Sequence, residues 1–258
     1  MFSLENLSFY YKSAEPIFDN FTWIVHPGER WAVIGPSGCG KSTLLYLLAG
    51  LVKPVEGKVR IGGQVLDRPR PATGLILQDY GLLPWATVYE NVTIGLRLRN
   101  FYGPDGKHAP RENVIGTYEH EAHEWIDRLG LSAVATHYPG QISGGQRQRT
   151  AIARTLTLHP DLLLMDEPFA SLDAPAREGL QKLILQIQVD RALTLVIVTH
   201  SIEEAALMGQ NILVMAKPPN EVPRIIDNPQ AGKIESLNTP SYFEMCDHLR
   251  GLIEEVQL

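Results

Sequence analysis

Residues 35–43 read Gly35-Pro36-Ser37-Gly38-Cys39-Gly40-Lys41-Ser42-Thr43, which matches the spacing G-x-x-x-x-G-K-[ST]. The apolar run 31–34 precedes this segment and the run 44–50 follows it, so the segment joins a predicted strand to a predicted helix. Glycines let successive backbone N–H groups turn toward one anion, and the start of a helix adds the positive end of its dipole. The segment therefore predicts a phosphate-binding loop in an α/β domain.

Side chains of this loop have predicted roles toward a nucleoside triphosphate and its Mg²⁺. Lys41 is placed to reach the β- and γ-phosphates, the Ser42 hydroxyl to bind Mg²⁺, and Thr43 to donate to the α-phosphate. We interpret Cys39 as a packing residue, because a glycine-rich loop needs a small side chain at this position. The two cysteines, Cys39 and Cys246, do not make a disulfide framework in a chain of this length. The loop alone specifies a nucleoside triphosphate and leaves the reaction open.

Two carboxylates, Asp166 and Glu167, follow the apolar run Leu162–Met165. A buried strand that ends in an aspartate at the phosphate side of a sheet holds Mg²⁺, so we assign this role to Asp166. Glu167 is predicted to polarise a water for in-line attack on the γ-phosphate, and Pro168 ends the strand and fixes the direction of Glu167. The alternative is a solvated Asp-Glu turn, which so apolar a strand disfavours.

Short apolar, β-branched runs alternate with helical patterns along most of the chain. The predicted strands are Phe2–Phe9, Phe21–Val25, Arg30–Ile34, Lys58–Ile61, Gly74–Leu77, Leu162–Met165, Thr194–Thr199 and Ile212–Met215. The predicted helices are Lys41–Gly50, Val88–Arg99, Thr117–Leu129, Gly144–Leu158, Ala174–Val189, Ser201–Gly209 and a short amphipathic one at Tyr242–Glu255. This alternation predicts a mainly parallel sheet covered on both faces, with a nearly all-helical insertion and a surface loop at Phe101–Asn113.

Residues 142–146 read Ile142-Ser143-Gly144-Gly145-Gln146 and open another predicted helix. The Ser143 hydroxyl and the N–H groups that follow it face an anion, as the phosphate loop does. One nucleotide does not need two phosphate cradles from one chain. We therefore expect residues 143–146 to meet the nucleotide that a second copy of the chain holds.

With these segments in this order, the chain resembles the ATP-binding cassette (ABC) ATPases, in which the phosphate loop of one subunit and this signature segment of the other enclose ATP. The resemblance covers nearly the whole chain; Ile142 stands where leucine is usual. It implies that Gln78 contacts Mg²⁺ and the attacking water, that Ser171-Leu172-Asp173 crosses the dimer, and that His200 lies near the γ-phosphate.

The resemblance also implies an architecture, a reaction and its cofactors. The expected fold is a RecA-like P-loop core with an N-terminal antiparallel β subdomain (1–87 and 159–216), an inserted helical subdomain (88–158) and a short C-terminal extension (217–258). ATP and Mg²⁺ are the expected cofactors, and ATP hydrolysis by a homodimer is the expected activity. Adenine is expected to stack on Tyr11, with Tyr10 left open as the alternative.

The segment Gln78–Val92 indicates which kind of cassette this is. It contains LLPW-x-TV-x-ENV, which is similar to importer cassettes of the nitrate, sulfonate and taurine group. The apolar side chains of Leu82, Leu83 and Trp85 are suited to bind a short helix of an integral membrane permease. An external solute-binding protein would deliver the solute to that permease. In the alternative interpretation Trp85 packs under the helical subdomain. The rival function is a regulatory or nucleic-acid-linked ABC ATPase.

Composition limits the remaining classes of function. The net charge of −6 gives no global basic footprint for nucleic acid, so no nucleic-acid partner is expected. Apolar runs fall short of the roughly 18–20 residues that cross a bilayer, so a peripheral position on the cytoplasmic face of the membrane is expected. His120, His123 and Glu124 have a spacing that zinc could use, but we favour a solvated helix face.

Overall fold

The computed structural model describes residues 1–12, 15–102, 117–233, 237 and 239–257. The larger of two sheets within these ranges has six strands in the order β10-β9-β3-β8-β7-β6. Five of them are parallel, and β10 pairs antiparallel with β9 at one edge. Their bounds are β3 (Arg30–Ile34), β6 (Thr73–Ile76), β7 (Leu162–Asp166), β8 (Thr194–Val198), β9 (Asn211–Val214) and β10 (Arg224–Asp227).

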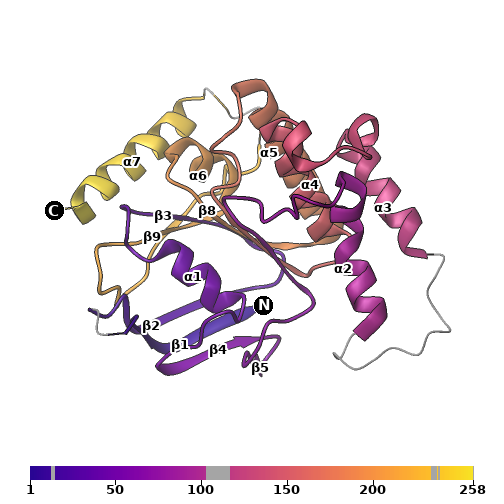
Figure 1. Ribbon diagram of the computed structural model, residues 1–258. Coiled ribbons are helices and arrows are strands. Elements are labelled where there is room, and N and C mark those ends of the chain that lie inside the picture. The colour runs from indigo at the N-terminus through magenta and orange to yellow at the C-terminus, as the bar shows by residue number, and fades with distance from the viewer. Residues whose placement is uncertain (13–14, 103–116, 234–236, 238, 258) are drawn as a thin grey trace.

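A smaller antiparallel sheet has the order β2-β1-β4-β5 and is built by the N-terminal third of the chain. Figure 1 shows this sheet and α1 on one side of the larger sheet, with α5, α6 and α7 on the other side. The bounds are β1 (Phe2–Phe9), β2 (Phe18–Val25), β4 (Glu56–Ile61), β5 (Gln64–Val65), α1 (Lys41–Leu48), α5 (Ala174–Arg191), α6 (Ile202–Met208) and α7 (Pro240–Gln257).

The central strand β3 explains why both faces of the larger sheet are covered. All five of its residues are buried, and its side chains alternate between two cores. Trp31 and Val33 pack with α1 and the antiparallel sheet, whereas Ala32 and Ile34 pack with α6 and α7. A parallel strand this apolar is stable only between two layers, as the sequence pattern predicts.

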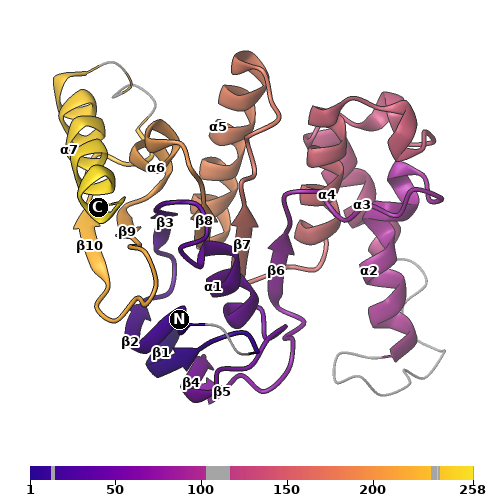
Figure 2. The same ribbon diagram turned by 60° about the vertical axis from the view of Figure 1, so that its left-hand side comes forward.

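Three helices lie together beyond the edge strand β6 in Figure 2. They are α2 (Val88–Tyr102), α3 (Thr117–Arg128) and α4 (Gly144–Leu156), and two 3-10 turns (Ser132–Val134 and Pro139–Gln141) precede α4. Trp125 and Ile152 from these helices share a core cluster with Leu163 of β7 and Ile184 of α5. The helical segment is therefore packed continuously onto the α/β core.

The fold class that the sequence predicts is confirmed, and several predicted boundaries are wrong. The strand predicted from Phe21 begins at Phe18, and α2 continues through residues 101–102 of the predicted loop, whose positions 103–113 lie outside the described residues. The predicted short helix at the C-terminus is α7, with 18 residues. The sequence patterns missed β5 and β10, because β5 has two residues and β10 exposes most of its side chains at a sheet edge. None of the helices in the described ranges has the length and apolar character that crossing a membrane requires.

Candidate functional site

Four neighbouring parallel strands bring the predicted site segments to one edge of the larger sheet. In the order β3, β8, β7 and β6, their carboxyl ends lead to the phosphate loop, His200, Asp166–Glu167 and Gln78. Because parallel strands end at the same edge, segments up to 165 residues apart in the chain become neighbours there. The strand order thus brings together site segments that are far apart in the sequence.

The phosphate loop is held in a conformation that glycine permits and other residues do not. Gly40 has a φ of 107°, and a Cβ atom on it would lie 2.4 Å from Ile17 Cγ2. A Cβ atom on Gly35 would lie 2.6 Å from the carbonyl oxygen of Met215. The Lys41 ammonium lies over this loop and donates to the carbonyl of Gly35 at 2.8 Å. Neither position has room for a Cβ atom, so the conformation of the loop depends on glycine at both.

A cleft of about 340 Å³ lies in front of this loop. Its lining combines the predicted phosphate, metal and water-activating residues with two apolar ones, Ile17 and Val198, that sequence reasoning missed. No motif contains Ile17; it reaches the cleft through the β1–β2 connection. The predicted residues in the lining are Tyr11, Ser37, Gly38, Gly40, Lys41, Ser42, Thr43, Gln78, Asp166 and Glu167.

Of the other loop residues, Cys39 is a free, buried thiol in the core that α1 and the antiparallel sheet share, as the packing interpretation predicts. Burial raises its pKa, which keeps the thiol protonated. Gly35 and Pro36 support the loop from behind through their carbonyls, which accept from Lys41. These three residues shape the cradle without lining the cleft.

Asp166 is the last residue of the buried strand β7 and is itself buried. Burial raises the pKa of its carboxyl; the hydrogen bond from Ser42 and the charge of Lys41 lower it, and the charge of Glu167 raises it. The contact with Ser42 joins two of the three residues that the sequence analysis assigns to Mg²⁺; the third is Gln78. A hard divalent cation beside them would offset the burial of this charge.

Glu167 lies between two of the other predicted residues. Gln78 Nε2 donates to Glu167 Oε2 at 3.1 Å, and His200 Nδ1 lies 3.1 Å from Glu167 Oε1. The Glu167 backbone has a φ of 47°, which is uncommon for a residue other than glycine and is found at sites that need a fixed direction. Its side chain is 22% exposed, so one carboxylate is oriented from two sides yet still reaches solvent.

Tyr11 and Tyr10 point to different places. Tyr11 lines the cleft, its hydroxyl lies 3.3 Å from Thr43 Oγ1, and its ring packs edge-on against Phe9. Tyr10 lines a separate hollow with Pro16 and Asp19. The geometry therefore favours Tyr11 as the aromatic residue beside a bound nucleotide.

The signature segment lies at the N-terminus of α4, outside the cleft lining. Ser143 Oγ accepts from the backbone N–H of Gln146 at 3.2 Å, and Gln146 Oε1 accepts from the N–H of Ser143 at 2.9 Å. This capping box leaves the N–H groups of Gly144 and Gly145 at the positive end of the helix. Asp173 Oδ1 accepts from the N–H of Ala176 at 2.9 Å and so caps α5 with a single bond; Asp173 also lies outside the cleft lining.

Two further features bear on the sequence predictions. Trp85 is 74% exposed, so the interpretation in which it packs under the helical subdomain is wrong. His120, His123 and Glu124 are exposed on α3, and no group of three metal-ligating side chains gathers anywhere in the described ranges, which agrees with a solvated helix face.

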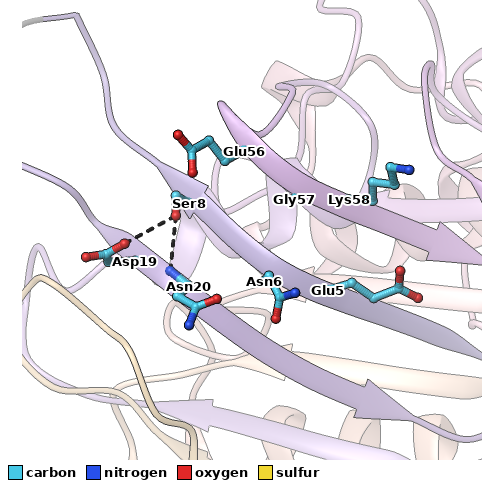
Figure 3. A pocket seen from close by; sticks show the side chains of 8 residues that line it. All are labelled: Glu5, Asn6, Ser8, Asp19, Asn20, Glu56, Gly57 and Lys58. Carbon is cyan, nitrogen blue, oxygen red and sulfur yellow. Dashed lines mark hydrogen bonds between the residues drawn. The ribbon is translucent and has the colours of Figure 1, made fainter.

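A larger hollow, of about 490 Å³, lies on the outer face of the antiparallel sheet (Figure 3). Polar side chains of β1, β2 and β4 surround it, among them Glu5, Ser8 and Asp19. It contains none of the predicted site residues. The smaller cleft is the candidate site, because it lies at the carboxyl ends of the parallel strands and the larger hollow does not.

Comparisons with known proteins agree with this geometry. The family described as ABC transporter matches residues 18–170. The aliphatic sulfonates import ATP-binding protein SsuB of Bacillus thuringiensis is 38% identical over 82% of this chain and 78% of its own length. The taurine import ATP-binding protein TauB of Pelagibacter ubique is 40% identical over 79% and 71%. The ATP-binding cassette MJ0796, solved as a dimer in a post-hydrolysis state with ADP and Pi, has a TM-score of 0.76 at 31% identity, covering 88% of this chain and 98% of that one.

Proposed function

Because this chain belongs to the ABC transporter family of ATP-binding proteins, we propose that it hydrolyses Mg-ATP to energise the import of a small solute. The observation that carries the proposal is the position of Glu167, oriented by Gln78 on one side and His200 on the other beside the phosphate loop. A carboxylate held in this way is suited to accept a proton from an attacking water.

The residues of the cleft fit Mg-ATP. The loop needs glycine at position 40, where a Cβ atom would meet Ile17, and Lys41 brings a positive charge to the cleft that the loop lines. Asp166 and Ser42, with Gln78, provide the oxygen ligands that Mg²⁺ prefers. When bound, Mg-ATP supplies the phosphoryl group that water attacks; the chain binds the phosphates, orients the water through Gln78 and takes its proton at Glu167. Tyr11 offers a ring for adenine to stack on.

We further propose that two copies close on two ATP molecules. Ser143 and Asp173 are exposed at helix N-termini, and the N–H groups of Gly144 and Gly145 begin α4, but all of them lie outside the cleft of their own chain. They would contact the nucleotide bound to the other copy. The dimeric form of the related cassette MJ0796 supports this arrangement.

A membrane permease is the proposed partner, because the names of the relatives refer to import. It would dock near Gln78–Val92 from the cytoplasmic face, and an external solute-binding protein would deliver the solute. We propose the division into an α/β core with β subdomain (1–87 and 159–216), a helical subdomain (88–158) and a C-terminal extension (217–258); the grouping of α2–α4 beyond β6 in Figure 2 supports it. The same names disfavour the regulatory or nucleic-acid-linked rival.

Substitution Glu167→Gln tests the proposed reaction. We expect ATP binding to persist, the dimer to stay closed in Mg-ATP, and turnover to fall by about 10²–10⁴-fold, because an amide accepts no proton from water. Phosphate release and size-exclusion chromatography measure the two effects. Glu254→Gln on the exposed face of α7 is the matched control. Turnover of Glu167→Gln at the wild-type rate would disprove the assigned role.

A further inference from the structure

Tyr80 and Ser171 form a hydrogen bond between two segments that the sequence analysis treats separately. Tyr80 comes two residues after Gln78, and Ser171 comes two residues before Asp173. The two hydroxyl groups are 91 positions apart in the chain. A contact between them therefore connects the segment that enters the cleft with the segment that faces away from it.

The main chain at Tyr80 is fixed by a third element. Arg154 Nη2 donates to the Tyr80 carbonyl and Nη1 to the Gly81 carbonyl, both at 2.7 Å. The Tyr80 backbone has a φ of 66°, a conformation that such a clamp helps to retain. Arg154 lies on α4, the helix that begins at the signature segment. The turn at residues 80–81 is thus hydrogen-bonded to α4.

Ser171 in turn lies against the start of the same helix. A Cβ atom on Gly144 would lie 4.0 Å from Ser171 Oγ, and one on Gly145 would lie 3.2 Å from Leu172 Cδ2. These short distances place the side chains of Ser171 and Leu172 beside the N-terminus of α4. The Tyr80 hydroxyl therefore closes a ring of contacts that runs through Ser171, the signature helix and Arg154.

We propose that Tyr80 is a positioning residue: its hydroxyl, bonded to Ser171, sets the signature segment and Asp173 at a fixed place relative to Gln78 of the same chain. The inference rests on the proposed function, because the signature and Asp173 then serve the other copy's ATP while Gln78 serves its own. The bond therefore makes the geometry of the chain's own ATP pocket depend on that of the pocket in the other copy. Neither hydroxyl touches the nucleotide in this account.

A double-mutant cycle with Tyr80→Phe and Ser171→Ala tests the proposal. Each change removes one hydroxyl and keeps the remaining side chain. We expect each to lower kcat by about fivefold, the ratio that one neutral hydrogen bond is worth, with KM and the affinity for Mg-ADP nearly unchanged. The double variant should also be about fivefold slower, because both changes remove the same bond. Tyr242→Phe, which removes a hydroxyl bonded to the Glu203 carbonyl on α6, is the control and should keep the wild-type kcat.

The outcomes distinguish a failure of the proposed role of Tyr80 from a failure of the proposed function. If the wild-type chain hydrolyses ATP but the two changes multiply to about 25-fold, or neither alters kcat, this inference fails and the proposed function stands. If the wild-type chain does not hydrolyse ATP, both fail. Equal melting temperatures of all variants would show that kcat does not change through unfolding.

Discussion

Glu204 is a buried carboxylate in the first turn of α6, four residues after His200. Thr199 Oγ1 donates to Glu204 Oε2 at 2.6 Å, and Arg177 Nε lies 3.9 Å from Glu204 Oε1, too far for a hydrogen bond. Burial raises the pKa of this carboxyl, and the contacts with Thr199 and Arg177 lower it only in part. Sequence reasoning missed Glu204, since a Glu near a helix start is ordinary.

A raised pKa means that the folded chain binds this proton more tightly than the unfolded chain does. Protonation of Glu204 therefore contributes fully to the free energy of unfolding at a pH below the pKa that this glutamate has in the unfolded chain. The contribution is lost as the pH rises through the pKa that Glu204 has in the folded chain. We expect Glu204→Gln to raise the melting temperature at pH 8 by about 2–4 °C, the shift that ~1 kcal/mol gives at this chain length. The advantage should vanish near pH 4. A lower melting temperature at pH 8 would show that the ionised carboxylate is the stabilising form. Calorimetry at pH 4 and pH 8 measures the melting temperatures of both chains.

The loop that precedes α2 shows how one element fixes a surface. Asn91, fully buried on α2, donates to the carbonyls of Leu83, Ala86 and Thr87 at 3.0–3.1 Å and accepts from the Leu83 N–H at 2.8 Å. Residues 83–87 are thereby attached to the helix, and Trp85 projects into solvent. A rigid, exposed indole ring is a favourable anchor for a partner.

Substitution Trp85→Ala tests the docking of the permease at this loop. We expect ATP hydrolysis by the isolated chain to stay within twofold of wild type, while co-purification with the permease and permease-stimulated hydrolysis fall at least about tenfold, the effect of losing a central anchor. Val222→Ala removes another exposed apolar side chain far along the sequence and serves as the control. Undiminished assembly of the Trp85→Ala chain would place the docking surface elsewhere.

Sequence patterns predict most of the helices and strands. The features that they miss depend on contacts between segments that are distant in the sequence. Strand β3 is predicted because Trp31–Ile34 form an apolar run, and all five of its residues are buried. Strand β10 is missed because Arg224 and Asp227 are exposed at an edge, where the backbone of β9 alone selects the strand. The phosphate loop is predicted by its spacing, whereas Ile17 and the Tyr80–Ser171 contact depend on how turns distant in sequence meet.

In the whole molecule, the decisive feature is that one chain presents two incomplete half-sites. The cleft contains the phosphate loop, Asp166 and Glu167, and the signature segment lies outside it on α4. A C2 pair would bring each signature to the other copy's cleft and complete two pockets at once. This requirement for a second copy is the central claim of the account.

Mixed dimers of a Lys41→Ala chain with a Ser143→Asp chain test this claim most directly. Aspartate caps a helix as well as serine does, so α4 stays intact while a negative charge faces the phosphates. Each variant alone should hydrolyse no ATP. In the purified mixed dimer one pocket combines both defects and the other has neither, so we predict about half of the wild-type rate per dimer. A mixed dimer as inactive as its parents would contradict the account.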